Sequence, residues 1–476
     1  MELILLPLIF SVLAFVIPAA YTRLFGLVAT GLTLLVSLFH LLGFHATHPE
    51  QLDLGLKIGT FQLDGLSILM LLLTNAIVFL ILLANYARSI SGEKLFTAMT
   101  LLMQFGLVGV FTTNDLIGFY IFWELTLIPI FFILYWYGNF DNKRSLMQFF
   151  LYTLFGSLAM LVSVVAIFLL TKESNWEALV SADLSSIGSA SIWLMGGFLL
   201  AFAVKIPLFP FHTWQAETYT KAPVAGTMLL SALMLKMALF GMLKWMIPLF
   251  DGMALDFWRW PVVVLGCIGI VYGALIALKQ NDLKTLFAYA SLSHLGLIAA
   301  ALMIGSTFIY SSVMLQVVNH SIVALGLFLA AGIIEQRLGH RNLDQLGGIA
   351  KVAPRFGFWF AVLTFVGLSV PFTAGFIGEF VLIKSLFDVH NLTGVIAAST
   401  LVLGAVYMLR AYQNSMFGPS TVTSFQDLHW NELLVFAILG IAAIYFGLSP
   451  KCILDFVSPT FDHMQQLMNS SANAAL

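Results

Sequence analysis

The chain has 476 residues, of which 60% are hydrophobic and only 9% are charged. A water-soluble protein of this length cannot bury so much apolar surface, so the composition indicates a protein that lies in a lipid bilayer. The formal net charge of −2 argues against a nucleic-acid-binding protein, and two distant cysteines, Cys267 and Cys452, do not form a disulfide framework, a zinc site or an iron–sulfur site.

Apolar stretches recur along the whole chain, and each is long enough to cross about 30 Å of hydrocarbon as a helix. We expect about fourteen spans, at residues 2–20, 22–43, 66–86, 94–112, 115–137, 145–171, 190–219, 223–247, 257–279, 283–304, 306–333, 354–389, 391–417 and 432–449. The first stretch lacks the basic n-region of a signal peptide, so we interpret it as a retained span. The expected fold class is therefore an all-α polytopic membrane protein.

Two of the expected spans are interrupted by proline. "VKIPLFPFHTW" contains Pro207 and Pro210, "LSVPFTAGFIGEF" contains Pro371, and the two segments lie five spans apart. Proline removes a backbone donor and clashes with the preceding turn, so each span should be kinked or unwound near its middle. Paired broken helices indicate an internally repeated transporter fold. Because five is odd, two five-helix repeats, spans 4–8 and 9–13, would have inverted topology.

This repeat divides the chain into four expected parts. They are an N-terminal three-helix segment (1–90), a first repeat (91–250), a second repeat (251–420), and a C-terminal helix with its tail (421–476).

Lysine and arginine are distributed unequally between alternate loops. One side holds thirteen: Arg23, Arg88, Lys94, Lys143, Arg144, Lys221, Lys279, Lys284, Arg337, Arg341, Lys351, Arg355 and Arg410. The other side holds six: Lys57, Lys172, Lys244, Arg259, Lys384 and Lys451. The richer side is expected to be cytoplasmic, which would leave both termini on the periplasmic side of a bacterial inner membrane.

Six ionisable residues fall roughly midway along apolar segments, where they could form a row at one depth. They are Glu124, Lys205, Lys236, His294, His320 and Glu379. A charged side chain at the centre of a bilayer costs on the order of 2.5–3.5 kcal/mol even on the lenient insertion scale, so six such groups indicate function. Separating a Glu–Lys pair in hydrocarbon should release a proton from the lysine.

The helix breaks suggest how such groups could exchange protons with water. Unwound backbone is tolerated within a membrane only where it is buried in protein or lines water. We therefore expect Lys205 and Glu379 to be the gates of two half-channels, with Lys236, His294 and His320 connecting them laterally. Two structural alternatives stay open: each histidine could be a satisfied hydrogen-bonding residue between helices, and Glu124 with Lys205 could be a purely structural ion pair.

Four segments resemble the antiporter-like membrane subunits of respiratory complex I. They are "NDLIGFYIFWELTLIP", "VKIPLFPFHTW…KAPVAGTMLLSALMLKMALFG", "LKQNDLKTLFAYASLSHLGLI" and "VPFTAGFIGEF", and the resemblance covers about residues 60–450. Glu379 stands where the L-type, N-type and Mrp antiporter D-type chains usually carry lysine, and where the M-type chain carries glutamate. The resemblance implies a NADH–quinone oxidoreductase in which Glu124, Lys205, Lys236 and Glu379 handle protons.

The resemblance also implies partners. Flavin, iron–sulfur clusters and quinone are expected on other chains, so no cofactor or metal is expected in this one. The expected partners are the L-type and N-type chains, the peripheral arm reached through them, and the lipid bilayer. The rival hypotheses are a subunit of a Mrp-type Na⁺/H⁺ antiporter or membrane-bound hydrogenase, a haem-binding electron carrier that uses His294 and His320 as axial ligands, and an inert scaffold.

Overall fold

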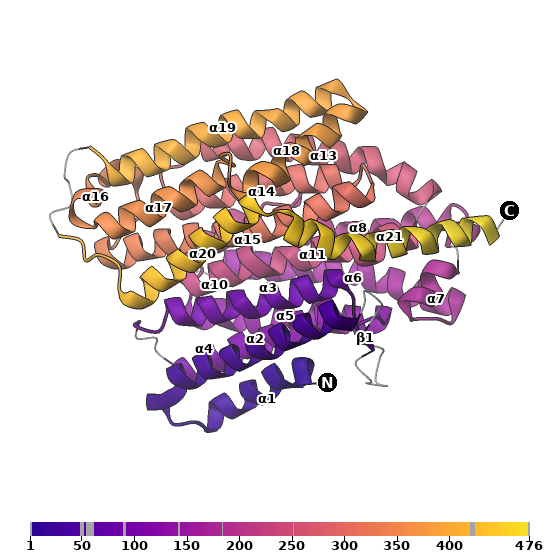
Figure 1. The fold of residues 1–476 in the computed structure, drawn as a ribbon, viewed down its shortest axis with the longest axis horizontal. Helices are drawn as coiled ribbons and strands as arrows, with labels where there is room; N and C mark the ends of the chain where they lie inside the picture. The colour runs from indigo at the N-terminus through magenta and orange to yellow at the C-terminus, as the bar shows by residue number, and fades with distance from the viewer. Residues whose placement is uncertain are drawn as a thin grey trace.

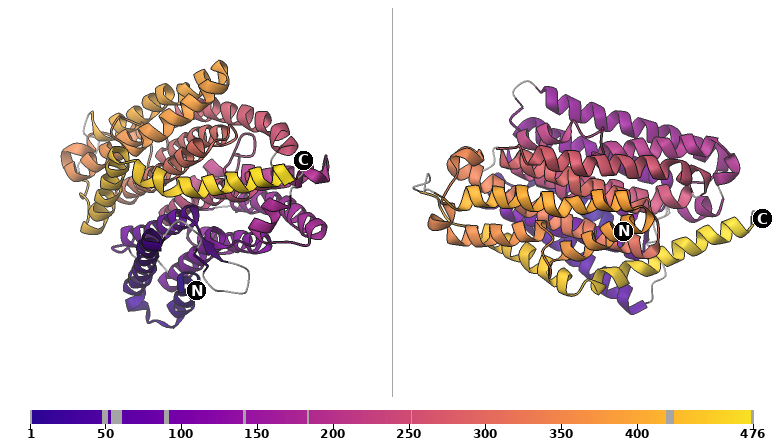
Figure 2. Two further views of the ribbon diagram at one scale, coloured as in Figure 1. Left: turned by 45° about the vertical axis from the view of Figure 1, so that its right-hand side comes forward. Right: turned by 90° about the horizontal axis from the view of Figure 1, so that it is seen from above.

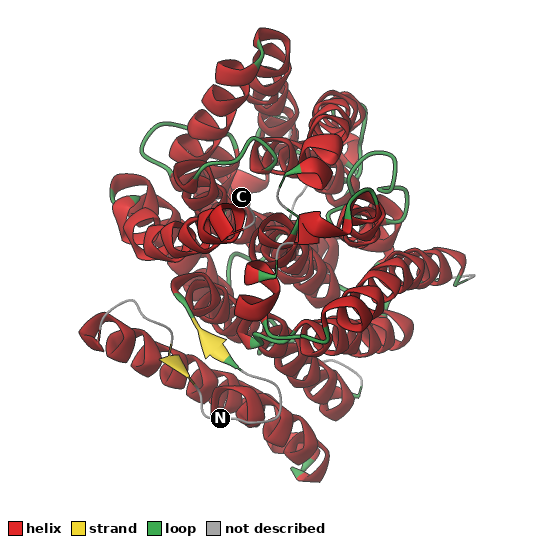
Figure 3. Cartoon of the chain, turned by 90° about the vertical axis from the view of Figure 1, so that its right-hand side faces the viewer, coloured by secondary structure: helices red, strands yellow, loops and turns green. Residues whose placement is uncertain are grey.

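The structure, a computed structural model, describes residues 2–47, 52–53, 61–88, 92–140, 143–182, 184–250, 252–418 and 424–474. Its long helices run side by side along one axis (Figures 1 and 2), and most of them are seen end-on when the molecule is viewed along that axis (Figure 3). The N-terminal helices form one edge of the bundle, and α17 (Pro354–Gly367) and α19 (Asn391–Met416) lie at the opposite edge (Figure 1). The expected all-α polytopic class is confirmed.

A helix, or a set of consecutive helices, occupies each of the fourteen expected spans in the described part of the chain. Eleven of these segments are long and apolar enough to cross a membrane: ten of the eleven single helices, since α1 is shorter, and the composite segment Val224–Leu249. The single helices are α1 (Glu2–Val16), α2 (Thr22–Thr47), α3 (Gly65–Ala84), α4 (Glu93–Thr112), α5 (Leu116–Tyr137), α6 (Arg144–Thr171), α13 (Met253–Ala277), α14 (Leu283–Leu302), α15 (Thr307–Leu338), α19 and α20 (Trp430–Leu448).

The remaining three spans are built from several pieces. The seventh consists of α8 (Ala190–Lys205) and α9 (Gln215–Lys221), and the twelfth of α17 and α18 (Ala374–Val389). The eighth, Val224–Leu249, is continuous but alternates between two helix types: α10 (Val224–Leu229), the π-helical η3 (Leu230–Met234), α11 (Leu235–Gly241), the π-helical η4 (Met242–Met246) and α12 (Ile247–Leu249).

Short elements connect the spans on the two faces. They are the turns η1 (Ala19–Tyr21), η2 (Leu184–Ile187) and η5 (Leu343–Gln345), the helices α7 (Trp176–Ser181) and α16 (Ile349–Val352), and an antiparallel pair of strands, β1 (Leu52–Asp53) and β2 (Gln62–Leu63).

The predicted helix breaks are confirmed. The chain is non-helical between α8 and α9 and between α17 and α18, around Pro207 and Pro371 respectively. In the second break, Ser369 and Phe372 have backbone φ angles of 53° and 73°, in the left-handed region that non-glycine residues seldom adopt. Both broken helices are the fourth span of a five-span repeat.

Matching contacts also support the internal repeat. Asp115 caps α5 and forms a bridge to Asn175, while Asp282 caps α14 and forms a bridge to Asn342. In each repeat, the start of the second span (α5 or α14) therefore contacts the loop that follows the third span (α6 or α15). Since α5 and α14 are the fifth and tenth spans, they begin at opposite faces of the membrane, as inverted repeats require.

Glycines allow close contact between α13 and α14. A Cβ atom on Gly266 would lie 2.6 Å from the carbonyl oxygen of Gly296, and one on Gly296 would lie 2.7 Å from that of Gly266. Small residues at such a crossing let membrane helices approach until their backbones touch. This contact fixes the position of α14, the helix that carries Ser291 and His294.

The C-terminal helix α21 (Lys451–Ala474) lies where only a tail was expected after the last span. Its buried residues Ile453, Val457, Phe461 and Met464 recur at helical spacing, so only one face is apolar. A helix of this kind is too polar to register as a membrane span. It packs beside α15 and extends past the end of the bundle (Figure 1).

The assignment of two lysines to loops was wrong. Lys244 lies in η4 and is 4% exposed, and Lys284 lies at the start of α14 and is 1% exposed. Each pairs with a carboxylate that comes from a distant part of the chain, which loop counting cannot anticipate. Lys57, which was counted on the same side as Lys244, lies outside the described residues.

Candidate functional site

Lys236, His320 and Ser291 form a hydrogen-bonded chain across three helices. Lys236 Nζ on α11 lies 2.8 Å from His320 Nδ1 on α15, and His320 Nε2 lies 2.8 Å from Ser291 Oγ on α14. Lys236 Nζ also donates to the carbonyl oxygen of Ser231 in η3. When the lysine is protonated, His320 must accept at Nδ1 and can donate from Nε2 to Ser291. The two bases can therefore exchange one proton directly.

No carboxylate lies within ion-pairing distance of Lys236 among the described residues, although the side chain is 0% exposed. Its ammonium is bonded only to a carbonyl oxygen and an imidazole. Two π-helical turns, η3 and η4, flank the helix that carries it. Such turns are frequently found at functional sites, and their wider winding shifts side chains out of the regular helical register.

Glu379 and His294 form a second cluster. Glu379 Oε1 on α18 lies 2.8 Å from His294 Nδ1 on α14 and accepts a hydrogen bond of 3.1 Å from Gln316 Nε2 on α15. The hydroxyl of Tyr407 on α19 lies 3.5 Å from His294 Nε2. The Glu379 side chain is only 3% exposed, so its charge depends on these polar neighbours.

The two clusters face each other across one turn of helix. Ser291 and His294 are three residues apart on α14, and Gln316 and His320 are four apart on α15, so each pair shares a helix face. A cavity of about 40 Å³ between these helices is lined by both histidines and by Ser291. A water molecule needs at least about 10–15 Å³ and two to four polar partners, so the cavity has room for a bridging water.

The structure does not bring Glu124 and Lys205 into direct contact. No ion pair within 4.0 Å joins them among the described residues, and one carboxylate oxygen of Glu124 is buried without a hydrogen-bond partner. Lys205 is the last residue of α8 and its ammonium lies 5.4 Å from the centre of the Trp123 ring. The ring face and the negative end of the α8 dipole both favour the cation there.

Buried polar atoms without partners collect beside both breaks. Gln316 Oε1, Asn319 Oδ1 and Ser369 Oγ are unbonded near the start of α18, where Gly375 leaves room for the side chains of Asn319 and Ser369. Near Lys236, Tyr219 OH, Gln215 Nε2 and Ser231 Oγ lie close together but make no well-formed hydrogen bond. Buried polar atoms in folded proteins are normally satisfied by protein or by water, so these positions suit ordered water molecules.

Gln215, the first residue of α9, has the same sequence offset from the proline of its break as Glu379 has from Pro371. It follows Pro207 by eight residues, as Glu379 follows Pro371. Gln215 is not among the six predicted residues, because an amide inside a span carries no charge. The proline offset was the signal that could have found it.

Sequence reasoning also missed a buried ion pair. Lys244 Nζ lies 2.6 Å from Asp64 Oδ2, and the two side chains are 5% and 8% exposed. The ammonium lies 4.1 Å from the centre of the Trp176 ring, whose Nε1 donates to the carbonyl oxygen of Lys244. Asp64 Oδ1 also accepts from Ser67 N and caps α3. This pair fixes η4, and so the span that carries Lys236, to the start of α3.

A cluster of charges occupies the opposite end of the bundle. Lys284 lies 3.3 Å from Glu335, Arg341 bridges Glu335 and Asp282, and Glu432 pairs with Arg337 and Arg88. These residues come from α14, α15, α20, their adjoining loops and, for Arg88, the turn that follows α3. The cluster joins the second repeat to the last span at this face.

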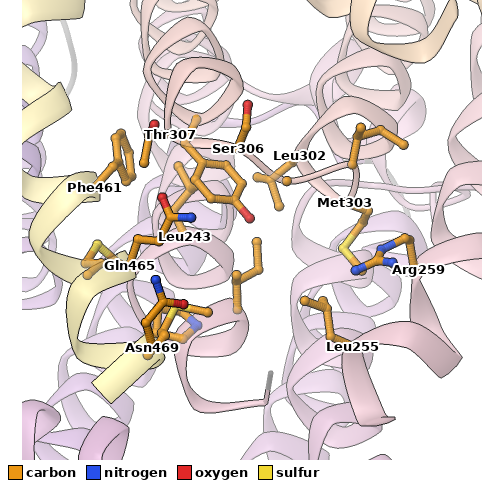
Figure 4. Close-up of a pocket in the computed structure, with 17 residues that line it drawn as sticks. Leu243, Leu255, Arg259, Leu302, Met303, Ser306, Thr307, Phe461, Gln465 and Asn469 are labelled. Carbon is orange, nitrogen blue, oxygen red and sulfur yellow. The ribbon is translucent and has the colours of Figure 1, made fainter. Parts of the chain in front are cut away.

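A cavity of about 210 Å³ near the other face contains none of the six predicted residues. One wall is α21, with Phe461, Gln465 and Asn469, and Leu255 and Arg259 of α13 face it (Figure 4). The cavity is therefore separate from the buried polar row. Among the described residues, no group of three His, Cys, Asp or Glu side chains could hold a metal ion.

Residues 113–404 match the family described as NADH:quinone oxidoreductase/Mrp antiporter, transmembrane. The chain is 30% identical to NADH-quinone oxidoreductase subunit M of Rickettsia felis, with 92% of this chain and 91% of the relative covered. It is also similar to a chain of respiratory complex I from Thermus thermophilus with bound NADH, at a TM-score of 0.88 and 30% identity, covering 98% and 99% of the two chains.

A chain of the Mrp complex from Dietzia sp. DQ12-45-1b has the same fold at 20% identity, with a TM-score of 0.84 and coverage of 98% and 99%. At this identity the likeness concerns the fold alone.

The Asp64–Lys244 pair predicts a non-additive effect on stability. Lys244→Met leaves the Asp64 carboxylate buried without its cation, and this should destabilise the chain by about 3–5 kcal/mol. Asp64→Asn combined with Lys244→Met removes both charges and should be milder than Lys244→Met alone. The temperature at which the detergent-solubilised protein aggregates measures the difference. A double variant less stable than Lys244→Met would contradict the pairing.

Proposed function

Since the chain belongs to the NADH:quinone oxidoreductase/Mrp antiporter transmembrane family, we propose that it is the M-type subunit of a proton-translocating NADH–quinone oxidoreductase. Near full-length similarity to a subunit M, and to a complex I chain with a TM-score of 0.88, supports this assignment. Glu379 within "GEF" agrees with it. In this proposal the chain translocates protons while quinone is reduced elsewhere in the complex.

The buried row from Lys236 to Glu379 is the observation that carries the proposal. Lys236 and His320 are in hydrogen-bond contact, and His294 and Glu379 are in contact one helical turn away. A water in the cavity between the two histidines would complete a path along which protons move laterally. An inert scaffold has no need of such a row, since each ionisable group in the membrane is costly.

The two helix breaks give this row access to the aqueous faces. Lys205 ends α8 at the first break, and Glu379 lies in the second turn of α18 beyond the other break. The unbonded polar atoms beside each break favour entering water. We assign Lys205 and Glu379 as gates, and Glu124 as the charge that acts on Lys205 from a distance without a direct ion pair.

In this assignment the chain contributes no redox chemistry. FMN, iron–sulfur clusters and quinone belong to partner subunits, and the direct partners are L-type and N-type antiporter-like chains of the membrane arm. The bond pattern of the histidines disfavours a haem carrier, because both ring nitrogens of His320 are occupied by Lys236 and Ser291. Glu379, and the greater similarity to subunit M than to the Mrp chain, disfavour an antiporter.

The orientation of the chain can be tested by labelling. Without the buried Lys244 and Lys284, twelve loop cations remain on one side and five on the other, so the bias persists. We therefore assign the richer side to the cytoplasm of a bacterial cell and both termini to the periplasm.

In a chain whose exposed Cys452 is replaced by serine, we expect a membrane-impermeant maleimide to label Glu173→Cys but not Lys351→Cys in intact cells. Both positions are exposed, and Glu173 lies in the loop after α6 whereas Lys351 lies in the short helix α16 on the opposite face. Labelling of both, or of Lys351→Cys alone, would contradict the orientation.

Removing the charge of the first half-channel should uncouple the subunit. Glu124→Gln or Lys205→Ala should lower NADH-driven proton pumping at least about tenfold, because each removes a group needed for proton transfer. Assembly should persist, since neither side chain makes an ion pair within 4.0 Å in the described chain. Glu124→Asp keeps the charge and should be milder. Near wild-type pumping in an assembled Glu124→Gln complex would refute this role.

Substitutions at Glu379 test the second gate. Glu379→Gln can still bond His294 and Gln316 but cannot ionise, so pumping should fall sharply without loss of assembly. Glu379→Lys places a cation where two donors now point, so it should be no better than Glu379→Gln. Proton pumping in membrane vesicles distinguishes the variants. If the lysine variant pumps more, the site needs a titratable group rather than a negative charge; if both pump normally, Glu379 is structural.

A further inference from the structure

An apolar cavity of about 430 Å³ lies behind α15, on the side away from His320. Val318 and Ile322 line it from α15, two residues before and two residues after His320. A side chain two positions along an α-helix points about 200° round the axis, so the cavity and the polar row lie on opposite faces at one depth. The other walls are α3, α20, the start of α21 and Leu41 of α2.

Hydrogen bonds hold the walls together at both ends of this cavity. At one end, Asn431 Nδ2 on α20 donates to the carbonyl oxygens of Leu83 and Ala84 at 2.9 and 3.1 Å. At the other end, Thr460 on α21 accepts from Gly65 N, the first residue of α3, at 3.0 Å. Between these fixed points the helices separate. On α3 the lining runs from Leu69 to Leu80, which is about 16 Å of helix.

The lining selects an apolar, elongated occupant. All of its residues are apolar except Tyr445 and Cys452, so water would find too few hydrogen-bond partners. An empty space of this size would forfeit the dispersion contacts of its walls. The volume lies within the range of about 300–1,000 Å³ typical of ligand sites. The surrounding bilayer supplies acyl chains of this shape.

A cation lies at the end of the cavity near the start of α21. Lys451 precedes the lining residue Cys452, is exposed, and makes no ion pair among the described residues. Asp455, one turn along α21, is also exposed and does not pair with it. The Phe456 carbonyl lies beside Gly65 at the start of α3, so Lys451 is close to that face and can extend toward a headgroup there.

We propose that this cavity, the α3/α15/α20 groove, binds one acyl chain of a membrane phospholipid whose phosphate meets Lys451. The bound chain supports α15 directly behind His320 and so helps to hold the Lys236–His320 contact. The support of α15 by the lipid rests on the proposed function, whereas the lipid-binding site itself does not.

Reactivity of Cys452 reports occupancy of the groove. The purified complex is stripped of loosely bound lipid with detergent and treated with N-ethylmaleimide, and the Cys452 peptide is quantified by mass spectrometry. Dioleoyl phosphatidylglycerol at about ten times its Kd should slow labelling about tenfold, because only the empty fraction reacts. Cys267, which is 6% exposed on α13 and far from the groove, is the internal control and should not respond.

Matched variants test where the lipid binds. Ala442→Trp fills the groove and should abolish the effect of phosphatidylglycerol, whereas Ile441→Trp, on the outer face of α20, should leave it intact. Ala76→Phe fills the groove from α3 if the tryptophan variant fails to assemble. Lys451→Gln should raise the concentration needed for protection. Three results would overturn the site. Phosphatidylglycerol could fail to protect Cys452 in the wild type, it could protect Cys452 equally in the two tryptophan variants, or only a long-tailed quinone could protect it.

Proton pumping tests separately whether the bound lipid supports α15. After lipid removal, Ala442→Trp should retain more pumping than Ile441→Trp, since the indole supports α15 in place of the lipid. If the two tryptophan variants lose pumping equally while phosphatidylglycerol still protects Cys452 in the wild type, the lipid does not support α15, but the binding site stands. Failure of the proposed function would leave the labelling results unchanged, because labelling needs no turnover.

Discussion

The whole structure depends on keeping ionisable side chains inside a layer that cannot hydrate them. A charge in hydrocarbon is costly unless other groups replace its water, and Lys236 is surrounded only by protein. Its bonds to the Ser231 carbonyl and to His320 serve as that replacement. Since neither partner carries an opposite charge, the proton is held loosely enough to be passed on.

The fold supplies this environment by departing from regular helix where the chemistry requires it. Two π-helical turns present Lys236, two breaks expose backbone beside Lys205 and before Glu379, and the contact between Gly266 and Gly296 lets α13 and α14 pack closely. Ion pairs such as Asp64–Lys244 fix the ends of the spans. Regular helices elsewhere satisfy their own backbone, so these few irregular places are where water and protons can enter.

The sequence was sufficient to predict the spans and the breaks, because length and proline inside apolar segments are local signals. The proton-handling roles of the six ionisable residues stay predictions. The sequence did not predict which atoms meet. Lys236 and His320 are 84 residues apart, and Asp64 and Lys244 are 180 apart, so only the tertiary fold pairs them. The open alternative of a Glu124–Lys205 ion pair fails on geometry. The division at residues 90, 250 and 420 stays a prediction.

Proton pumping in a His320→Gln complex tests directly whether protons pass through the contact between Lys236 and His320. Glutamine can accept a hydrogen bond from Lys236 and donate one to Ser291, but it cannot take up a proton at neutral pH. We expect an assembled complex with little pumping per NADH oxidised. Pumping at the wild-type level would contradict it, because the proton would then not pass through His320.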